Sequence, residues 1–312
     1  MLRRKDSSAD EPISYVPTNV PIQHELFDLD SLVTTAVEDS PPKPRRDRTI
    51  RKLPMDIALA RLIALGSRTA TLGVPSKMPG FSLTLPAEAC RLGRRLAENP
   101  LSICSQCFGV GAWYRVDYVI AAHRRHLQRI IHPRWVDAME TLILYHYDFD
   151  AADCFRWHDV GDVQNVQHLM KIAEVCRRTP EVRHWLPTHE PYIVLGYLNF
   201  VRAKRIPPIP SNLCIRISAN LIGEPPEHIP GLERFPTSTT HLGRGHWRAI
   251  RVPGQSKPFE CPSYQNSKSG KINSVGECGA CRACWQPKVR NVSYSIHQFR
   301  EPEKEQFRLP LI

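Results

Sequence analysis

The chain has 312 residues, of which 42% are hydrophobic and 23% charged, the composition of an ordinary globular protein. It contains no run of about 20 apolar residues, which argues against a membrane span, and its basic start is followed by polar residues where a secretory signal would be apolar. We therefore expect a cytoplasmic protein with ten reduced cysteines, for which metal ligation or catalysis is a better explanation than disulfides.

The charge is distributed unevenly along the chain. Residues 1–50 hold seven Lys or Arg and nine Asp or Glu, a balance of −2, so residues 51–312 carry +13 and the whole chain has a formal net charge of +11. A basic folded part favours an anionic partner, most commonly nucleic acid, although a merely soluble surface can have the same composition. Residues 1–50 are rich in Pro, Ser and Asp, which predicts a disordered arm ahead of one α/β domain over residues 51–312.

Helical and strand patterns alternate through the rest of the chain. The periodicity predicts helices over residues 53–65, 113–128, 133–147, 165–178 and 192–201, and strands over 80–86, 154–158, 183–189, 213–218 and 289–296. Strands that alternate with helices are typical of βα units around a mainly parallel sheet, whose ligands collect at the C-terminal ends of the strands.

Three cysteines follow the first predicted strand. Cys104 and Cys107 have the two-residue gap that lets both sulfurs reach one metal or cluster, and Cys90 lies upstream in the same loop. Three thiolates leave one position open, which suits a reacting iron or zinc site. The alternative is a buried Cys90 beside a small zinc knuckle or an unbound thiol pair.

Four further cysteines lie in a loop over residues 261–285. Cys278, Cys281 and Cys284 are evenly spaced as C-x2-C-x2-C, a pattern that wraps several thiolates around a [4Fe–4S] cluster, and Cys261 is the natural fourth ligand. Structural zinc sites more often use two separated CxxC pairs, so iron–sulfur is favoured over zinc here. Cys154, Cys176 and Cys214 are expected in the core.

Polar residues mark the ends of several predicted strands. They could bind a ribose or an amino group, or carry a proton, at the face where βα folds place their chemistry. For the residues that follow the strand predicted over 154–158, the alternative is that Asp162 caps the next helix and His158 packs below the site. A later basic and aromatic segment, 241–248, could grip phosphate or nucleic acid, or be a surface loop. The candidate cofactor-binding residues are His158, Asp159, Asp162, Thr188, Ser218 and Asn220.

The cysteine spacings and the segment Arg156-Trp157-His158-Asp159-Val160-Gly161-Asp162 together resemble the phage and plasmid family called gene product 88. The likeness covers roughly residues 75–300, and in its last strand the family's terminal His corresponds to His297. This resemblance implies a shared order of motifs and an origin in a phage or mobile element.

The layout is also similar to that of radical S-adenosylmethionine enzymes. Those enzymes are partial (β/α) barrels in which three thiolates hold a [4Fe–4S] cluster and S-adenosylmethionine fills the open iron. Their spacing is C-x3-C-x2-C, whereas thirteen residues separate Cys90 from Cys104 here. The resemblance implies a radical-SAM-like partial barrel with two clusters, S-adenosylmethionine as a possible cofactor and an electron donor as partner.

Two other functions remain open on the sequence. One is a zinc-bearing phage or plasmid protein that binds nucleic acid through its basic surface without catalysis. The other is a single structural cluster held by both groups of cysteines.

Overall fold

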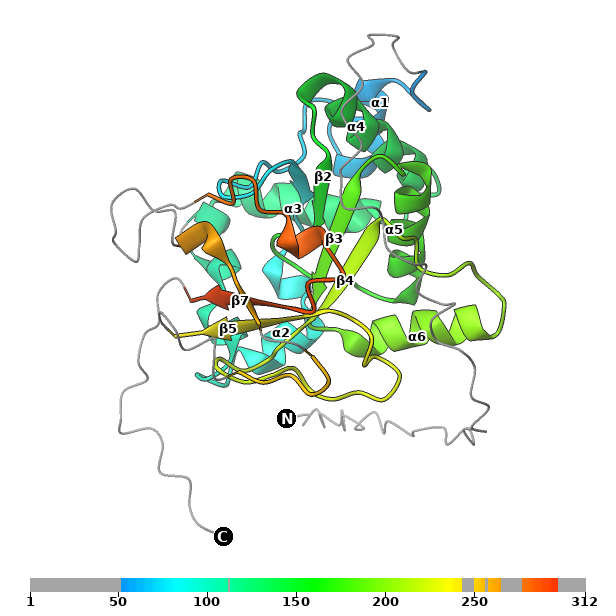
Figure 1. The fold of residues 1–312 in the computed structure, drawn as a ribbon. Coiled ribbons are helices and arrows are strands. Elements are labelled where there is room, and N and C mark those ends of the chain that lie inside the picture. Colours follow the sequence, from blue (N-terminus) through cyan, green and yellow to red (C-terminus); the bar gives the residue numbers. More distant parts are fainter. Residues whose placement is uncertain (1–51, 112, 243–249, 256–257, 265–276, 297–312) are drawn as a thin grey trace, which may run out of the picture.

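The computed structural model describes residues 52–111, 113–242, 250–255, 258–264 and 277–296; the predicted arm lies outside these ranges. Seven parallel strands form one open sheet in the order β1-β2-β3-β4-β5-β7-β6, which makes the fold mixed α/β (Figure 1). The strands are β1 (Phe81–Leu83), β2 (Cys154–Trp157), β3 (Arg183–Thr188), β4 (Leu213–Ser218), β5 (Thr237–His241), β6 (Phe259–Glu260) and β7 (Asn291–Ser295).

Local capping explains where several helices begin. Asp56 accepts a hydrogen bond from the amide of Leu59 at the start of α1, Asn165 caps α5 in the same way, and α6 begins at a proline, whose missing N–H is no loss there. The helices are α1 (Ile57–Leu65), α2 (Arg91–Leu96), α3 (Asp117–Arg129), α4 (Trp135–Asp150), α5 (Val166–Arg178) and α6 (Pro191–Arg202).

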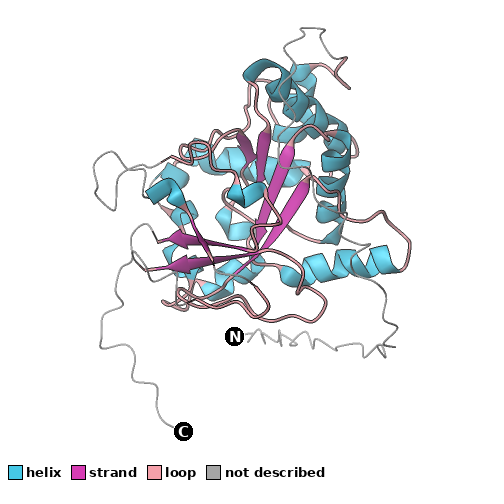
Figure 2. Ribbon diagram, in the orientation of Figure 1, coloured by secondary structure: helices cyan, strands magenta, loops and turns pink. Residues whose placement is uncertain are grey.

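The two faces of the sheet have different neighbours because successive strand residues point to opposite sides. On one face, Phe155, Trp157, Leu186 and Ile215 pack into the main core with the helices, and α4, α5 and α6 lie along this side of β2–β4 (Figures 1 and 2). On the other face, Trp185 packs against the short 3-10 turn η8 (Ala283–Trp285). We call this second side the inner face.

Most predicted elements are present, with shifted ends. The strand predicted over 80–86 is only Phe81–Leu83, and the helix predicted from residue 113 begins at Asp117 after a 3-10 turn. The loop that carries the first three cysteines contains the short helix α2, which the sequence analysis missed.

Two strands were also missed, β5 and β6. Strand β5 reads Thr-Ser-Thr-Thr-His, so it lacks the apolar alternation on which the prediction depended, and β6 has only two residues. No helix in the described ranges is long and apolar enough to cross a membrane.

Candidate metal centres

The first cysteine segment crosses the C-terminal ends of the strands. Ser102 pairs with Leu221 just beyond β4, and the amide of Ile103 donates to the carbonyl of Asn220 at 3.2 Å. The segment therefore runs from the end of β1 to the end of β4, across the edge where parallel folds gather their ligands.

The three thiols of this segment lie close together, each with intermediate exposure. A Cβ atom placed on Gly93 would lie 3.7 Å from the Cys104 sulfur and 3.8 Å from the Cys90 sulfur, so both sulfurs border the same small space. Burial raises the pKa of Cys104 to about 11, and the neighbouring Cys107 adds to the rise. Burial also raises the pKa of Cys107, but the backbone N–H groups of Gly109 and Val110 oppose the shift.

The segment from Arg156 to Asp162 joins β2 to this cysteine loop. The Thr84 hydroxyl donates to Asp159 at 2.5 Å, which ties the segment to the end of β1. Gly161 has a φ of 84°, and a Cβ there would lie 2.5 Å from the Leu85 Cβ. A Cβ on Gly109 would lie 2.4 Å from Val160. The two glycines thus permit a close approach that side chains would block.

Asp162 is buried at the centre of this arrangement. Its carboxylate accepts hydrogen bonds from the amide of Val163 at 2.7 Å, the Thr188 hydroxyl at 2.7 Å and the amide of His189 at 2.8 Å. Burial raises the pKa of Asp162 to about 6, and His189 and these donors oppose the rise. Asp162 in turn adds to the burial-driven rise of the Cys90 pKa, so carboxyl and thiol are neighbours. The side chain that caps the start of α5 is that of Asn165, whereas Asp162 links the ends of β2 and β3.

Two further predicted residues lie along the same edge. The imidazole of His189 donates from Nδ1 to the Asn220 side-chain oxygen at 3.1 Å, which connects the ends of β3 and β4. Ser218 accepts from the Ser238 hydroxyl at 3.1 Å on the inner face. Glu190 accepts from the amide of Leu92 at 2.9 Å and thereby holds the start of α2.

His158 is placed differently from its neighbours in the motif. Its φ is 59°, in the left-handed region, and its ring lies 5.1 Å from that of His168 on α5. Burial lowers the pKa of His158 to about 4. The ring is therefore a neutral group packed toward α5, the alternative that the sequence had left open.

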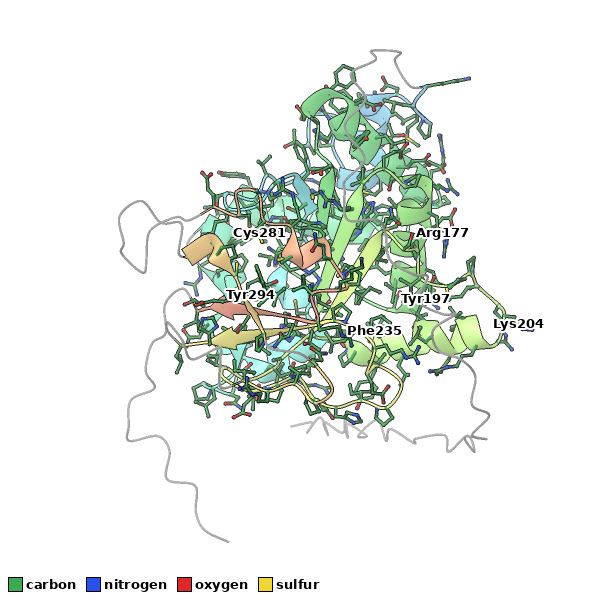
Figure 3. The ribbon with its side chains drawn as sticks, viewed as in Figure 1. Arg177, Tyr197, Lys204, Phe235, Cys281 and Tyr294 are labelled. Atoms are coloured by element: carbon green, nitrogen blue, oxygen red, sulfur yellow. The ribbon has the colours of Figure 1, made fainter. Side chains whose placement is uncertain are left out.

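The late cysteines also converge. Burial raises the pKa of Cys278 to about 11, and the thiols of Cys261 and Cys281 add to the rise. Burial raises the pKa of Cys284 to about 12, and the Tyr294 hydroxyl, 3.2 Å from its sulfur, opposes the shift. The amide of Cys278 donates to the carbonyl of Lys77 at 2.8 Å, which attaches this group to the segment before β1. Figure 3 shows Cys281 and Tyr294 on the side of the sheet away from Arg177 and Tyr197, which lie on α5 and α6.

A fully buried arginine holds the late loop on the sheet. All five N–H groups of Arg216 on β4 donate to backbone carbonyls, at distances from 2.7 to 3.1 Å. The accepting residues are Thr237, Ala283, Cys284, Gln286 and Val289. The Trp285 indole adds a buried hydrogen bond to the carbonyl of Phe155 at 3.0 Å. The backbone of η8 is thereby fixed over the inner face.

Arg156 lies between the two groups of cysteines. Its guanidinium carbon is 4.7 Å from the centre of the Trp185 ring, and its charge counteracts the burial-driven rise of the Cys278 pKa. Burial raises the pKa of Tyr114 to about 12; Asp159 and Cys107 add to that rise and Arg156 opposes it. One cation therefore lies within electrostatic reach of residues at both groups.

The structure brings all seven predicted ligand cysteines into two sets, and within each set the thiols act on one another electrostatically. Within the described ranges, no group of three or more His, Cys, Asp or Glu side chains is arranged to hold a metal ion as it stands. Metal ligation therefore stays a prediction. The predicted Thr188 and Asp159 are structural partners of Asp162 and Thr84, respectively.

Three residues beside the late cysteines were not predicted from the sequence: Arg216, Lys77 and Tyr294. Arg216 had one visible signal: it is the single charged residue in the apolar stretch Leu213–Ser218. Of the segment 241–248, His241 is buried with its Nδ1 atom 2.8 Å from the Ser293 hydroxyl, while residues 243–249 and His297 lie outside the described ranges.

One comparison with known proteins gives a match. The protein family described as gene product 88 matches residues 58–287, which include all seven predicted ligand cysteines. No curated protein and no solved structure matches the chain.

Proposed function

This chain belongs to the gene product 88 family, and we propose that it is an iron–sulfur protein with two clusters. In this proposal Cys90, Cys104 and Cys107 hold one [4Fe–4S] cluster at the C-terminal ends of the strands. Cys261, Cys278, Cys281 and Cys284 hold a second cluster over the inner face.

The observation that carries the proposal is the convergence of the four late cysteines. Cys261 is 17 positions upstream of Cys278, yet the Cys261 thiol raises the pKa of Cys278, and both of these thiols raise the pKa of Cys284. The Cys281 thiol raises the pKa of Cys261 and of Cys278. A cluster binds each cysteine to a different iron, so it needs sulfurs spread more widely than the roughly 2.3 Å bonds to a single zinc allow.

Charge around the late group also suits a cluster. Thiolate-bound clusters are anionic, and the positive charges of Arg156 and Arg282 act on Cys278, while Arg216 acts on Cys284. In the metal-free protein the raised pKa values keep these thiols protonated at neutral pH. Ligation therefore has to release protons, and these three cations favour the resulting thiolates.

The first group offers three thiolates and so leaves one iron open. If S-adenosylmethionine bound at that iron, the cluster would supply the electron that begins radical chemistry. In this proposal the open parallel sheet corresponds to the partial (β/α) barrel of radical S-adenosylmethionine enzymes. The residues beside Cys90 would position the bound molecule: Asp162 holds its own place through three hydrogen bonds, while His189 and Asn220 line the adjoining strand ends.

Anaerobic purification followed by a visible spectrum and metal analysis tests the proposal. We expect a broad band near ~400 nm and about eight iron and eight sulfide per chain, because each cluster contains four of each. Cys104→Ala and Cys281→Ala should each remove about half of the iron. Cys176→Ala is the matched control, because this fully buried thiol lies in the helix core on α5 and should keep the full content.

Two results would contradict the proposal. Colourless protein with stoichiometric zinc would favour a zinc protein. Equal iron loss from all three variants would show that the loss follows from general destabilisation and not from ligand removal.

A further inference from the structure

The rim of the first cysteine group is basic. Residues 86–129 contain seven arginines and three acidic residues. Arg91, Arg94 and Arg95 follow Cys90 directly along α2, and Arg115 comes shortly after Cys107; all four are exposed. Within the described ranges none of the four makes an ion pair. We call these four residues the arginine rim.

Exposed aromatic and apolar side chains lie among these arginines. Phe108, next to Cys107, is 54% exposed and Tyr118, at the start of α3, is 62% exposed. The Phe108 ring meets the ring of Tyr114 edge to face at 5.8 Å, so its orientation is held while much of its surface stays open. Arg91 and Arg115 each donate to one backbone carbonyl, of Gln164 and Val110 respectively, and keep their charge free of an acidic partner. Exposed aromatic groups near such cations are typical of a binding site.

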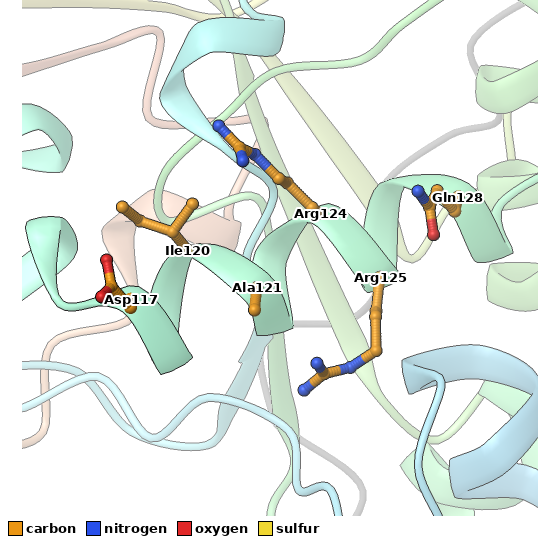
Figure 4. Close-up of a pocket in the computed structure, with 6 residues that line it drawn as sticks. All are labelled: Asp117, Ile120, Ala121, Arg124, Arg125 and Gln128. Atoms are coloured by element: carbon orange, nitrogen blue, oxygen red, sulfur yellow. The ribbon is translucent and has the colours of Figure 1, made fainter.

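The arginines of the nearby α3 helix have other roles. A hollow of ≈ 470 Å³ lies along α3, lined by Asp117, Ile120, Ala121, Arg124, Arg125 and Gln128 (Figure 4). Arg124 pairs with Glu88 at 3.0 Å, and the Arg125 side chain packs against Gly66. These two side chains support the structure, so the hollow is not part of the arginine rim.

We propose that the arginine rim and Phe108 bind single-stranded nucleic acid and present one nucleotide to the three-cysteine site. Arginines attract phosphates, while a ring such as Phe108 stacks on a base, and the combination suits an unpaired strand because its bases are free. Chemistry on a nucleotide also needs that nucleotide out of a stacked duplex. The presentation to the site rests on the proposed function; the binding itself does not.

Fluorescence anisotropy of the full chain, purified anaerobically, tests the binding. The probes are labelled oligo-dT and oligo-U of about 12 nucleotides, within the usual range for single-strand sites, and a duplex of the same length. We expect both single strands to bind more tightly than the duplex. A preference for DNA or for RNA then identifies the source of the strand.

Paired variants locate the surface. Arg94→Ala with Arg95→Ala should weaken binding about tenfold and make the logarithmic salt slope shallower by about 1.4, since each lost phosphate contact contributes ~0.7. The control, Arg202→Ala with Arg205→Ala, removes the same charge from the far end of α6, near the Lys204 shown in Figure 3. Phe108→Ala should weaken binding about tenfold and Phe108→Tyr should restore it, because stacking needs a ring.

The inference is overturned if neither strand binds, if the duplex binds more tightly, or if the rim and control variants behave alike. Iron and sulfide counts on the same samples keep the two proposals distinct. Protein that holds iron but does not bind either strand leaves the proposed function standing and refutes the rim. Protein without iron whose binding depends on the rim refutes the proposed function and leaves the nucleic-acid surface standing.

Discussion

Arg216 shows how one side chain can organise a loop that has little regular structure. It is a buried cation whose five donors all go to backbone carbonyls, four of them in residues 283–289. The carbonyls of Ala283 and Gln286 also accept from amides of the turn, and Arg216 adds a second donor to each of them, so the backbone around Cys284 is fixed by β4. Its charge is then available to the neighbouring thiols, which is why the side chain matters to the site as well as to the fold.

Arg216→Lys is expected to lower the free energy of unfolding by about 2–4 kcal/mol, because an ammonium has three donors and at least two of the five carbonyls lose the hydrogen bond from this side chain. Urea denaturation measures this change. Arg202→Lys, at the exposed last residue of α6, should stay within about 0.5 kcal/mol of the parent. An equally small effect of both changes would show that the buried carbonyls have other partners.

Asp162→Asn tests the second buried charge. An asparagine can face the Thr188 hydroxyl and the amide of Val163 with its oxygen, but its NH2 then opposes the amide of His189. We expect a loss of about 1–3 kcal/mol in the free energy of unfolding. Thr188→Val in a double-mutant cycle should couple to it by at least about 0.5 kcal/mol; strictly additive losses would place the two side chains in separate networks.

At the scale of elements, the junction between β1 and the turn after β2 depends on closeness. Gly161 and Gly223 have φ values of 84° and 82°, but a Cβ on Gly161 would meet Leu85 at 2.5 Å whereas a Cβ on Gly223 would meet nothing within 4 Å. A substitution at Gly223 therefore tests backbone strain alone, whereas one at Gly161 tests backbone strain together with crowding.

Gly223→Ala should cost about 1 kcal/mol, the price of a left-handed residue with a side chain. Gly161→Ala should cost that amount and a further 1–3 kcal/mol or so, because the ends of β1 and β2 must move apart. Thermal unfolding of both variants provides the comparison. Equal losses would mean that the turn relaxes freely and that the close approach is not required.

Elements with a strong apolar period could be predicted from the sequence. Helix α5 and strand β4 appear within one residue of their expected ends because their buried residues repeat at the helical or strand period. Strand β5 could not be predicted, since its threonines are held by hydrogen bonds such as that from the Thr237 hydroxyl to Gln255 at 2.9 Å. The cysteines were evident from spacing, but the arginine and carbonyl partners that position them are contacts between distant segments.

At the scale of the whole molecule, several imidazoles are buried between the sheet and the helices. Burial lowers the pKa of His126 to about 4, that of His158 to about 4 and that of His184 to about 3, and lowers that of His168 well below its usual range. Each ring is therefore neutral in the folded protein at neutral pH. No sequence pattern marks these residues, because a buried and an exposed histidine look alike in a sequence.

These rings predict how stability depends on pH. An unfolded histidine titrates near 6.5, so the stability that each neutral ring contributes is fully present above that pH and is lost as the pH falls from 6.5 toward 4. Between these pH values, each ring lowers the free energy of unfolding by about 1.4 kcal/mol for every pH unit. Asp162 acts in the opposite direction, since its pKa is raised to about 6 and it binds a proton more readily when folded. The stability gained when Asp162 binds its proton offsets the loss from about one histidine ring. A steep net loss of stability is therefore expected between pH 6.5 and 4.

Urea unfolding at pH 7, 6 and 5 measures this slope, but cluster loss in acid would steepen it as well. His184→Leu distinguishes the two causes, because His184 is fully buried on β3 and packs beside Trp157, away from both groups of cysteines. Removing this ring should make the slope shallower by about 1.4 kcal/mol per pH unit while leaving the iron content unchanged. If the variant and the parent lose stability at the same rate, protonation of His184 is not coupled to unfolding and the acid sensitivity belongs to the metal sites.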